Sequence, residues 1–336
     1  MNAPSGSVIA SPKPLDGCQQ PSNGFQRFAF DGGNRFIKFF DSTSTPRSLL
    51  SCIKELADWE DVEPDASSVV IEWQSSRYVV GAAAAELKGK PTHKENKASL
   101  AQKLLLATLD GGQSGQVLID TLVVATPDSR LKDAVGQLSR LPGEYCFARN
   151  GRPTVARINR VQIVEECRAA WRYATQNGGY RWPRMKNAVL DMGGGTALGR
   201  VFTSSGQPVR GAEVKLPGTY DLAKRIAAAL QSRSEYSPDT SLVMDAIADG
   251  TYCIGQRTPF EGVFQQCRRQ WIDELRGALR EAWAAHMAEL GEVLVIGGSA
   301  PLARDFVDTT NGRFKIPTSP SPQYISLFGM LEGRCE

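Results

Sequence analysis

The sequence predicts an α/β protein made of two similar halves, each a mixed sheet that opens with an antiparallel hairpin and is flanked by helices. Two observations lead to this prediction. Alternating apolar residues surround a glycine turn in residues 25–40, and the same order of strand, glycine turn and strand returns in residues 186–209. After each hairpin, short apolar runs alternate with segments whose apolar residues recur every three or four positions, which is the spacing of an amphipathic helix.

The composition is that of a globular protein. Of the 336 residues, 41% are hydrophobic and 22% are charged, which excludes disorder of the whole chain and allows two domains. The net charge of +3 gives no reason to expect direct binding of nucleic acid over a broad surface. The most apolar stretches, such as residues 117–125, are too short for a membrane span, and seven scattered cysteines without a CxxC pair favour a cytoplasmic location.

The first half begins after residues 1–24, which are rich in Pro, Ser, Gly and Gln, lack the pattern of a secretory signal and are expected to form a flexible tail. Beyond the hairpin, the patterns predict the following elements: a strand at 67–73, a strand running into a helix at 77–87, a helix at 94–109, a strand at 117–127 that Pro127 closes, a helix at 128–141, and strands from 152 feeding a helix that begins near Glu165.

The second half repeats this plan after its own hairpin. The predicted elements are helices at 219–232 and 263–290, a strand at 292–296 with a Gly-Gly turn and a helix start, and a helical piece at 320–333. Trp271 and Trp283 recur at core spacing on the long helix and are expected to pack inside, whereas Arg268 and Arg269 are expected on its solvated face.

Three glycine turns contain the candidate functional residues. In the first, Asp31 ends a buried strand, Gly32 and Gly33 let backbone N–H groups approach phosphate oxygens, and Asn34 completes the turn. Lys38, seven residues after Asp31, can direct a positive charge toward the same phosphates. Taken alone, this turn is more typical of a solvent-exposed hairpin than of a phosphate site.

The second turn strengthens the phosphate interpretation. Asp191 again ends a buried strand, three glycines follow (Gly193, Gly194 and Gly195), and Thr196 adds a hydroxyl. Two hairpins that each end in an aspartate can hold a polyphosphate between two sets of backbone donors. A bridging divalent cation then fits both carboxylates, and Mg²⁺ suits such a site because it keeps most of its waters.

The third turn places Gly297, Gly298 and Ser299 between a strand and a helix, which leaves room for a base or ribose on the backbone. Neither of the first two turns leads into a helix, as the GxGxxG turn of a Rossmann fold must, because apolar strand residues follow both. The chain also has no GxxxxGK[ST] sequence, so a P-loop is excluded.

In this order, the three turns resemble the phosphate-1, phosphate-2 and adenosine motifs of the superfamily of actin, the sugar kinases and the 70-kDa heat-shock chaperones. The chain is most similar to bacterial and archaeal actin-like proteins of the ParM and StbA kind, through YVVGAAAAE, LVVATP and QYISLFGM at corresponding places. The resemblance implies a two-domain actin-like fold with the nucleotide in the interdomain cleft. Residues 25–187 would form domain I and 188–319 domain II, with a C-terminal helix in 320–336 packing back on domain I.

The resemblance also implies roles for individual residues. Asp31 and Asp191 would hold Mg²⁺ through its waters, and Glu166 would orient the attacking water, although Glu165 stands where the family has proline and the choice between the two stays open. For both glutamates, the alternative is a pair of carboxylates favoured at a helix N-terminus. The nucleotide would be bound by Gly32, Gly33, Asn34, Lys38, Gly193, Gly194, Gly195, Thr196, Gly297, Gly298 and Ser299, with Gly218 and Asp221 at a helix start nearby.

Three functions follow from this resemblance. The first is an ATPase that polymerises with Mg-ATP, with GTP as a possible replacement, and turns its filaments over by hydrolysis, in plasmid or DNA segregation with a DNA-bound adaptor protein as partner. The second is a small-molecule kinase of the same superfamily, although no acceptor-activating Asp motif of the sugar-kinase type is present. The third is a nucleotide-binding adaptor without turnover. A chaperone is disfavoured because no peptide-binding domain follows the adenosine motif.

Overall fold

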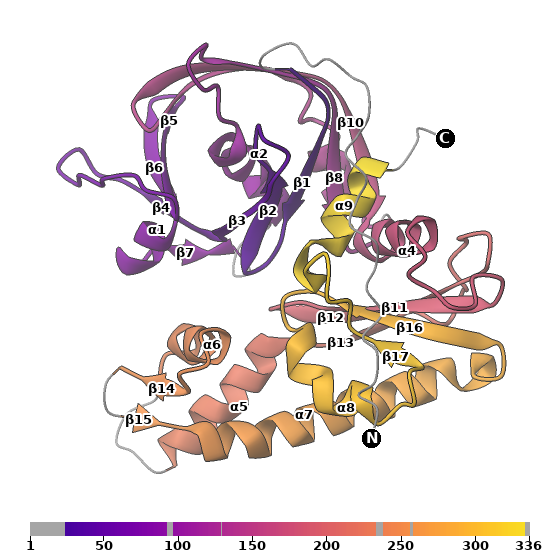
Figure 1. Cartoon of the computed structure of the whole chain (residues 1–336). Helices are drawn as coiled ribbons and strands as arrows, with labels where there is room; N and C mark the ends of the chain where they lie inside the picture. Colours follow the sequence, from indigo (N-terminus) through magenta and orange to yellow (C-terminus); the bar gives the residue numbers. More distant parts are fainter. Residues whose placement is uncertain (1–23, 93–96, 129, 233–237, 256–257, 333–336) are drawn as a thin grey trace. The chain divides into compact units, whose positions relative to one another are not determined.

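The computed structural model describes residues 24–92, 97–128, 130–232, 238–255 and 258–332 (Figure 1). The predicted tail lies outside these residues except for Gly24, with which the first strand begins. The described chain forms two compact units, and the division falls within helix α4. The large-sheet unit contains residues 24–173 and 324–332, and the small-sheet unit contains residues 174–323. No described helix is both long and apolar enough to span a membrane.

The large-sheet unit is built on one mixed sheet with the strand order β3-β2-β1-β8-β10-β9-β5-β6-β4-β7. Its strands are β1 (Gly24–Gly32), β2 (Phe36–Phe40), β3 (Pro46–Leu50), β4 (Cys52–Glu55), β5 (Ser68–Trp73), β6 (Ser76–Gly81), β7 (Lys90–Pro91), β8 (Gln116–Thr126), β9 (Gly143–Arg149) and β10 (Arg152–Glu165). Its helices are α1 (Ala82–Glu86), α2 (Lys97–Thr108), α3 (Lys132–Leu138), α4 (Glu166–Gln176) and α9 (Ile325–Glu332).

Successive side chains of β1 point alternately to the two faces of this sheet and contribute to the core on each face. Phe28 and Phe30 point into the core around α2, while Ala29 between them faces the opposite side. Figure 1 shows the sheet bent around α2, which explains why Leu104 to Ala107 are all buried. On the opposite face, Leu327 and Met330 of α9 pack against Ala29, so the C-terminal helix belongs to the core of this unit.

The small-sheet unit has a five-stranded sheet with the order β13-β12-β11-β16-β17. Its strands are β11 (Lys186–Met192), β12 (Thr196–Phe202), β13 (Val214–Pro217), β16 (Leu290–Ile296) and β17 (Phe314–Lys315), and β14 (Cys253–Ile254) pairs separately with β15 (Thr258–Pro259). Its helices are α5 (Thr219–Gln231), α6 (Thr240–Ala248), α7 (Glu261–Trp283) and α8 (Arg304–Asp308), with single 3₁₀ turns at Ala284–His286 and Ala300–Ala303.

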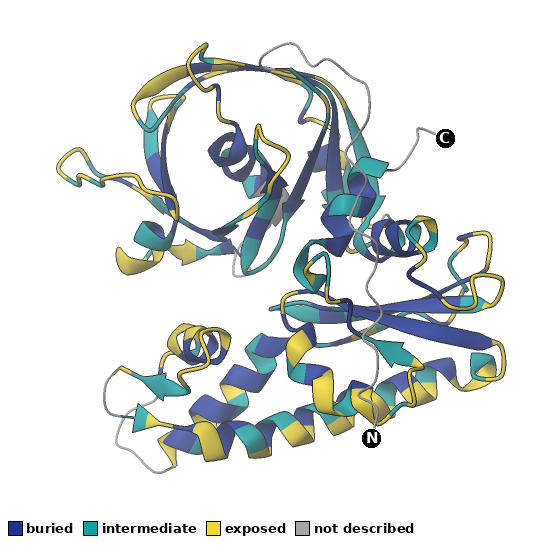
Figure 2. Cartoon of the chain, in the orientation of Figure 1, coloured by how far each residue is buried: buried dark blue, intermediate teal, exposed yellow. Residues whose placement is uncertain are grey.

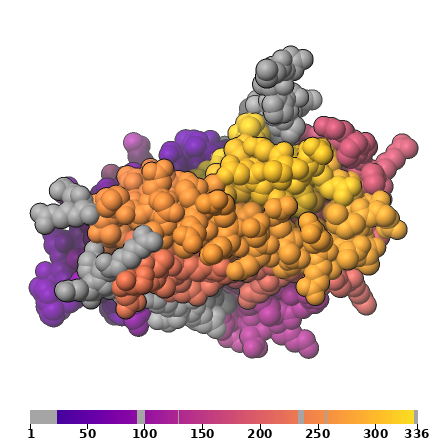
Figure 3. All heavy atoms as spheres, turned by 90° about the horizontal axis from the view of Figure 1, so that it is seen from below, coloured from indigo at the N-terminus to yellow at the C-terminus, as the bar shows by residue number. Residues whose placement is uncertain are grey.

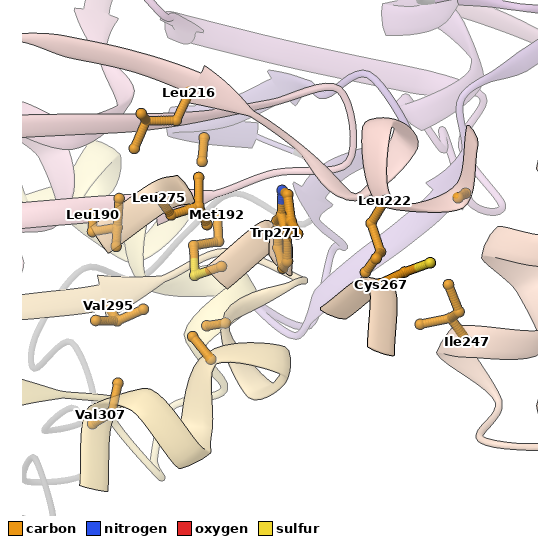
Figure 4. Packing of buried hydrophobic residues seen from close by; sticks show 14 of the residues in the cluster. Leu190, Met192, Leu216, Leu222, Ile247, Cys267, Trp271, Leu275, Val295 and Val307 are labelled. Carbon is orange, nitrogen blue, oxygen red and sulfur yellow. The ribbon is translucent and has the colours of Figure 1, made fainter. Parts of the chain in front are cut away.

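Helix α7 covers this sheet along its length. Its buried residues recur at every fourth position from Val263 to Trp283, so one side faces the core and the other is exposed (Figure 2). Figure 4 shows Trp271 between Met192 of the sheet and Leu222 of α5, and its indole Nε1 donates to the carbonyl of Pro217 at 3.0 Å. The polar side of α7 forms much of the surface drawn in orange in Figure 3.

The two sheets repeat one topology, as the paired hairpins predict. The order β3-β2-β1-β8-β10 in the large sheet matches β13-β12-β11-β16-β17 in the small one. In both runs the first three strands are antiparallel and the last three parallel. The expectation of two similar halves with mixed sheets is therefore confirmed.

Most of the predicted elements are present, but the long helix is shorter than predicted. Helix α7 ends at Trp283, and Leu290, expected as the last helical residue, is the first residue of β16. A 3₁₀ turn follows α7, and the glycine and β-branched residues after Leu290 favour a strand buried along its whole length. Helix α6 and the strands β3, β4, β7, β9, β13, β14, β15 and β17 were not predicted.

Candidate functional site

The first glycine turn joins β1 to β2 in the large-sheet unit. Asp31 lies opposite Lys38 in the antiparallel register, and the Lys38 ammonium is 2.9 Å from Asp31 Oδ2. Because Asp31 is only 4% exposed, an isolated carboxylate here would lose most of its hydration. The adjacent ammonium offsets this loss. Lys38 therefore compensates the charge of Asp31 as well as the charge of any anion that binds to the turn.

The turn itself is closed tightly by its backbone. A Cβ on Gly33 would lie 2.3 Å from the carbonyl oxygen of Phe36, so no other residue fits without moving the hairpin. Ser51, a residue that sequence reasoning did not single out, donates its hydroxyl to the Gly33 carbonyl at 2.6 Å. Asn34 occupies the turn after Gly33 and is half-buried.

The second glycine turn joins β11 to β12 in the small-sheet unit and has the same construction. Asp191 lies opposite Leu198, again seven residues later, and Gly193 takes the place of Gly33. The Gly193 N–H donates to the Thr196 carbonyl at 3.0 Å, and a Cβ on Gly193 would lie 2.7 Å from that oxygen. The two hairpins therefore match in register and in the place of the aspartate and of the close-packed glycine, whereas Leu198 stands where the first hairpin has Lys38.

Helix α5 supports the second turn from behind. The backbone N–H of Tyr220 donates to the Gly194 carbonyl at 2.8 Å, and the N–H of Thr219 to the Gly193 carbonyl at 3.4 Å. Within the described chain, the N–H groups of Gly194 and Gly195 have no protein acceptor. Backbone donors of this kind, close to a helix N-terminus, are suited to binding an anion.

Gly218 sets the distance between α5 and this turn. A Cβ there would lie 2.6 Å from the backbone of Gly195 and Thr196, so the helix start and the turn are in direct contact. Asp221, in the first turn of α5, forms an ion pair with Lys224 at 2.6 Å. This pair is partly exposed, which is typical of a solvated helix surface.

The third turn lies against the second. Gly297 follows β16 with a φ of +91°, and a Cβ on it would be 2.5 Å from Asp191 Oδ1. The Ser299 N–H donates to the Met192 carbonyl at 3.0 Å, and its hydroxyl hydrogen-bonds the hydroxyl of Thr219. Gly298 has more space, since the nearest atom to an added Cβ is Gln323 Oε1 at 3.9 Å.

The small-sheet unit thus brings together most of the predicted nucleotide-binding residues. This cluster consists of Asp191, Gly193, Gly194, Gly195, Thr196, Gly218, Gly297, Gly298 and Ser299. Thr219 also belongs to it and was missed by sequence reasoning, although its place after a glycine and at the start of a helix is a recognisable signal.

The remaining predicted residues belong to the large-sheet unit. Glu165 is the last residue of β10, opposite Thr126 of β8, and Glu166 is the first residue of α4. The predicted helix start is therefore confirmed. A glutamate in the first turn of a helix is compatible both with orienting a water and with stabilising the helix dipole.

The residues present fit a nucleotide with Mg²⁺ by their chemistry. Glycines occupy positions where a Cβ would collide with backbone, and each hairpin ends in one carboxylate. Among the described residues, no three His, Cys, Asp or Glu side chains gather into a site that could hold a metal ion by themselves. A cation held by one or two carboxylates together with phosphate oxygens and waters is the arrangement typical of Mg²⁺.

No protein-family model and no curated protein sequence matches the chain. Similarity to solved structures is extensive. The archaeal actin homologue Ta0583, solved in native form and with ADP, has TM-scores of 0.76 and 0.75 at 14% identity over 91% of this chain and 98% of its own. Apo pSK41 ParM has a TM-score of 0.67 at 16% identity, covering 92% and 96%.

A filament structure is also among these similar proteins. The ParM of a 15-stranded filament from Clostridium botulinum has a TM-score of 0.71 at 14% identity, over 91% of this chain and 97% of its own. These likenesses cover nearly the whole described chain and both of its sheets. The chain has the actin-like fold and in structure resembles the ParM-type proteins.

Proposed function

We propose that the chain is a filament-forming ATPase that polymerises with Mg-ATP and hydrolyses it to turn its filaments over. The observation that carries this proposal is the convergence of two glycine turns, the second and the third, in the small-sheet unit, together with an equivalent aspartate-ended turn in the large-sheet unit. Structural neighbours support it, because one contains ADP and others are filaments. Similarity to the ParM kind leads us to propose DNA segregation, through a DNA-bound adaptor, as the process served.

Each residue of the site has a proposed role in this reaction. Backbone N–H groups of the two hairpin turns bind the phosphates, with Lys38 adding positive charge, and Gly297, Gly298 and Ser299 hold the adenosine. Asp31 and Asp191 position the Mg²⁺, which when bound neutralises charge on the phosphates. Glu166 orients the attacking water. GTP is the nucleotide to compare with ATP.

Light scattering of the purified chain after addition of Mg-ATP, with Mg-ADP as the control, tests the proposal. We expect a rise with ATP that later decays as hydrolysis proceeds. No rise with either nucleotide would refute filament formation while leaving nucleotide binding, measured by calorimetry, as a separate question.

Two variants test the roles within the site. Asp191→Ala should abolish phosphate release while the protein stays folded. The control is Asp308→Ala, which changes an exposed aspartate of α8 in the same unit and should have no effect.

Glu166→Ala should keep nucleotide binding and prolong filament lifetime. Its control is Glu144→Ala, which changes an exposed glutamate. Filaments of Glu166→Ala that turn over at the normal rate would exclude Glu166 as the residue that orients water.

A further inference from the structure

A large hollow opens in the small-sheet unit where α7 ends and β16 begins. Its volume is about 650 Å³. Its floor is buried and apolar, with Trp283 and Leu290 each less than 3% exposed, while Trp182 and Met185 at its edge are 47% and 36% exposed. Because Leu290 and Gly297 stand at opposite ends of β16, this α7–β16 hollow is separate from the nucleotide turns.

The hollow is positively charged at its edge. Arg276, Arg280 and Arg313 line it, and no Asp or Glu is found among its described lining residues. Arg276 forms an ion pair with Asp273 at 3.4 Å, but in the described chain no carboxylate pairs with Arg280 or Arg313. An apolar site with free guanidinium groups favours an occupant that carries both a large apolar group and carboxylates.

A segment of that chemistry lies in the large-sheet unit, between β4 and β5. We call residues 57–66 the Trp59 loop. Trp59 is 86% exposed, and most of the loop is exposed in Figure 2. The loop contains five acidic residues and no basic one: Asp58, Glu60, Asp61, Glu63 and Asp65. A tryptophan so fully exposed is unusual, and exposed aromatic residues are the commonest anchors of protein interfaces.

The Trp59 loop holds its tryptophan in a defined turn. Glu60 Oε2 accepts the backbone N–H of Ala57 at 2.8 Å, and Glu60 Oε1 is 2.9 Å from the Lys54 ammonium. Arg77 donates to the Glu60 carbonyl at 3.0 Å. These contacts close the turn around Trp59, so little conformational freedom remains to be lost when the side chain is buried by a partner.

We propose that the Trp59 loop of one copy docks into the α7–β16 hollow of a second copy. Trp59 fills the apolar interior, and Asp58 and Glu63, which form no ion pair within the described chain, pair with Arg280 and Arg313. Glu60 and Asp61 keep their pairs with Lys54 and Arg77. The surfaces differ on the two partners, so the contact is heterologous and leaves one loop and one hollow free at the ends, which permits an open chain of subunits. This inference rests on the proposed filament function and names the contact that builds the filament.

Single-site variants test the contact by Mg-ATP polymerisation measured by light scattering and sedimentation. Trp59→Ala and Arg313→Glu should each raise the critical concentration about tenfold or more, as interface anchors do. The matched controls are Leu131→Ala, an exposed apolar residue of the same unit as Trp59, and Arg269→Glu, an exposed arginine of α7 outside the hollow. Both controls should polymerise like the wild type.

Mixing the two variants gives a sharper result. Trp59→Ala retains its hollow and Arg313→Glu retains its loop, so an equimolar mixture should form dimers that cannot grow, detected by analytical ultracentrifugation. Combining Glu63→Arg with Arg313→Glu in one chain should restore part of the polymerisation. Docking of the loop into the hollow of its own chain would instead leave the mixture monomeric, and that result would overturn the proposal.

The test also separates this inference from the proposed function. If Trp59→Ala and Arg313→Glu polymerise at the wild-type critical concentration, the docking is wrong while the filament function stands. If the wild type stays monomeric with both nucleotides, the docking and the filament are both wrong. Nucleotide affinity should be equal in all these variants, because none of them alters a residue of the glycine turns.

Discussion

Replacing Gly218 by alanine tests whether the contact between α5 and the second glycine turn positions that turn for the nucleotide. Gly218 has extended backbone angles, φ −87° and ψ −170°, which alanine adopts without strain. Any effect must therefore come from the added methyl group, which would lie 2.6 Å from the backbone of Gly195 and Thr196. Neither atom belongs to a flexible side chain that could turn aside.

The size of the effect follows from this distance. An ordinary contact begins at 3.4 Å, so the turn and the helix start must separate by about 0.8 Å. Overpacking of this kind costs about 1–3 kcal/mol of folding stability. A misplacement of about 1 Å can cost about 100-fold in an enzymatic rate, and by the same geometric reasoning we expect the affinity for ATP to fall by about 10- to 100-fold.

The assay is a calorimetric titration of ATP into Gly218→Ala, with thermal unfolding to show that the variant is folded. Gly277→Ala is the control, because a Cβ at this position of α7 meets no atom within 4 Å and alanine favours the helix. A folded Gly218→Ala protein that binds ATP as tightly as the wild type would refute the idea that this turn holds the phosphates.

Three further predictions concern stability. Lys315→Met should lower the free energy of unfolding, measured by urea denaturation, by about 3–5 kcal/mol. The reason is that Glu292 is 1% exposed and would lose the Lys315 ammonium at 2.8 Å. A loss below about 1 kcal/mol would contradict this. Trp271→Ala, at a fully buried site, should cost about 3–5 kcal/mol by the same measurement, against a small effect for the exposed Trp182→Ala. Burial and the carboxylate of Glu332 raise the pKa of Tyr173 to about 12. The contribution of the neutral Tyr173 side chain to the free energy of unfolding is therefore complete below about pH 10 and is lost as the pH rises toward 12. Tyr173→Phe should therefore lose less stability than the wild type between pH 10 and 12 in thermal melts, and identical pH profiles would exclude this role.

The hairpins could be predicted from sequence because their signals are local. An aspartate, a glycine turn and flanking alternation lie within ten residues of each other, and these patterns define both the strands and the candidate phosphate-binding turns. The contacts that hold the turns could not be predicted in this way. Ser51 reaches Gly33 from 18 positions away, and Thr219 meets Ser299 across 80 positions.

Among the elements that were not predicted, strand β9 and helix α6 have local signals in the sequence. Strand β9 forms a hairpin with β10 through Asn150 and Gly151, which have φ values of +53° and +72°, as an Asn-Gly turn favours. The apolar side chain of exposed Cys146 hides the alternation of β9. Helix α6 begins after Asp239, whose carboxylate accepts the Ser241 N–H, so its cap was also readable.

The equivalence of the two hairpins separates what the scaffold requires from what a ligand requires. Gly33 and Gly193 each face a carbonyl oxygen three residues later, so the backbone of either hairpin requires this glycine whether or not a phosphate binds there. Lys38 and Leu198 stand at equivalent places where the scaffold accepts a charge in one copy and a hydrocarbon in the other. The glycine is therefore a requirement of the hairpin itself, whereas the lysine is not, because the same register position holds a leucine in the second hairpin.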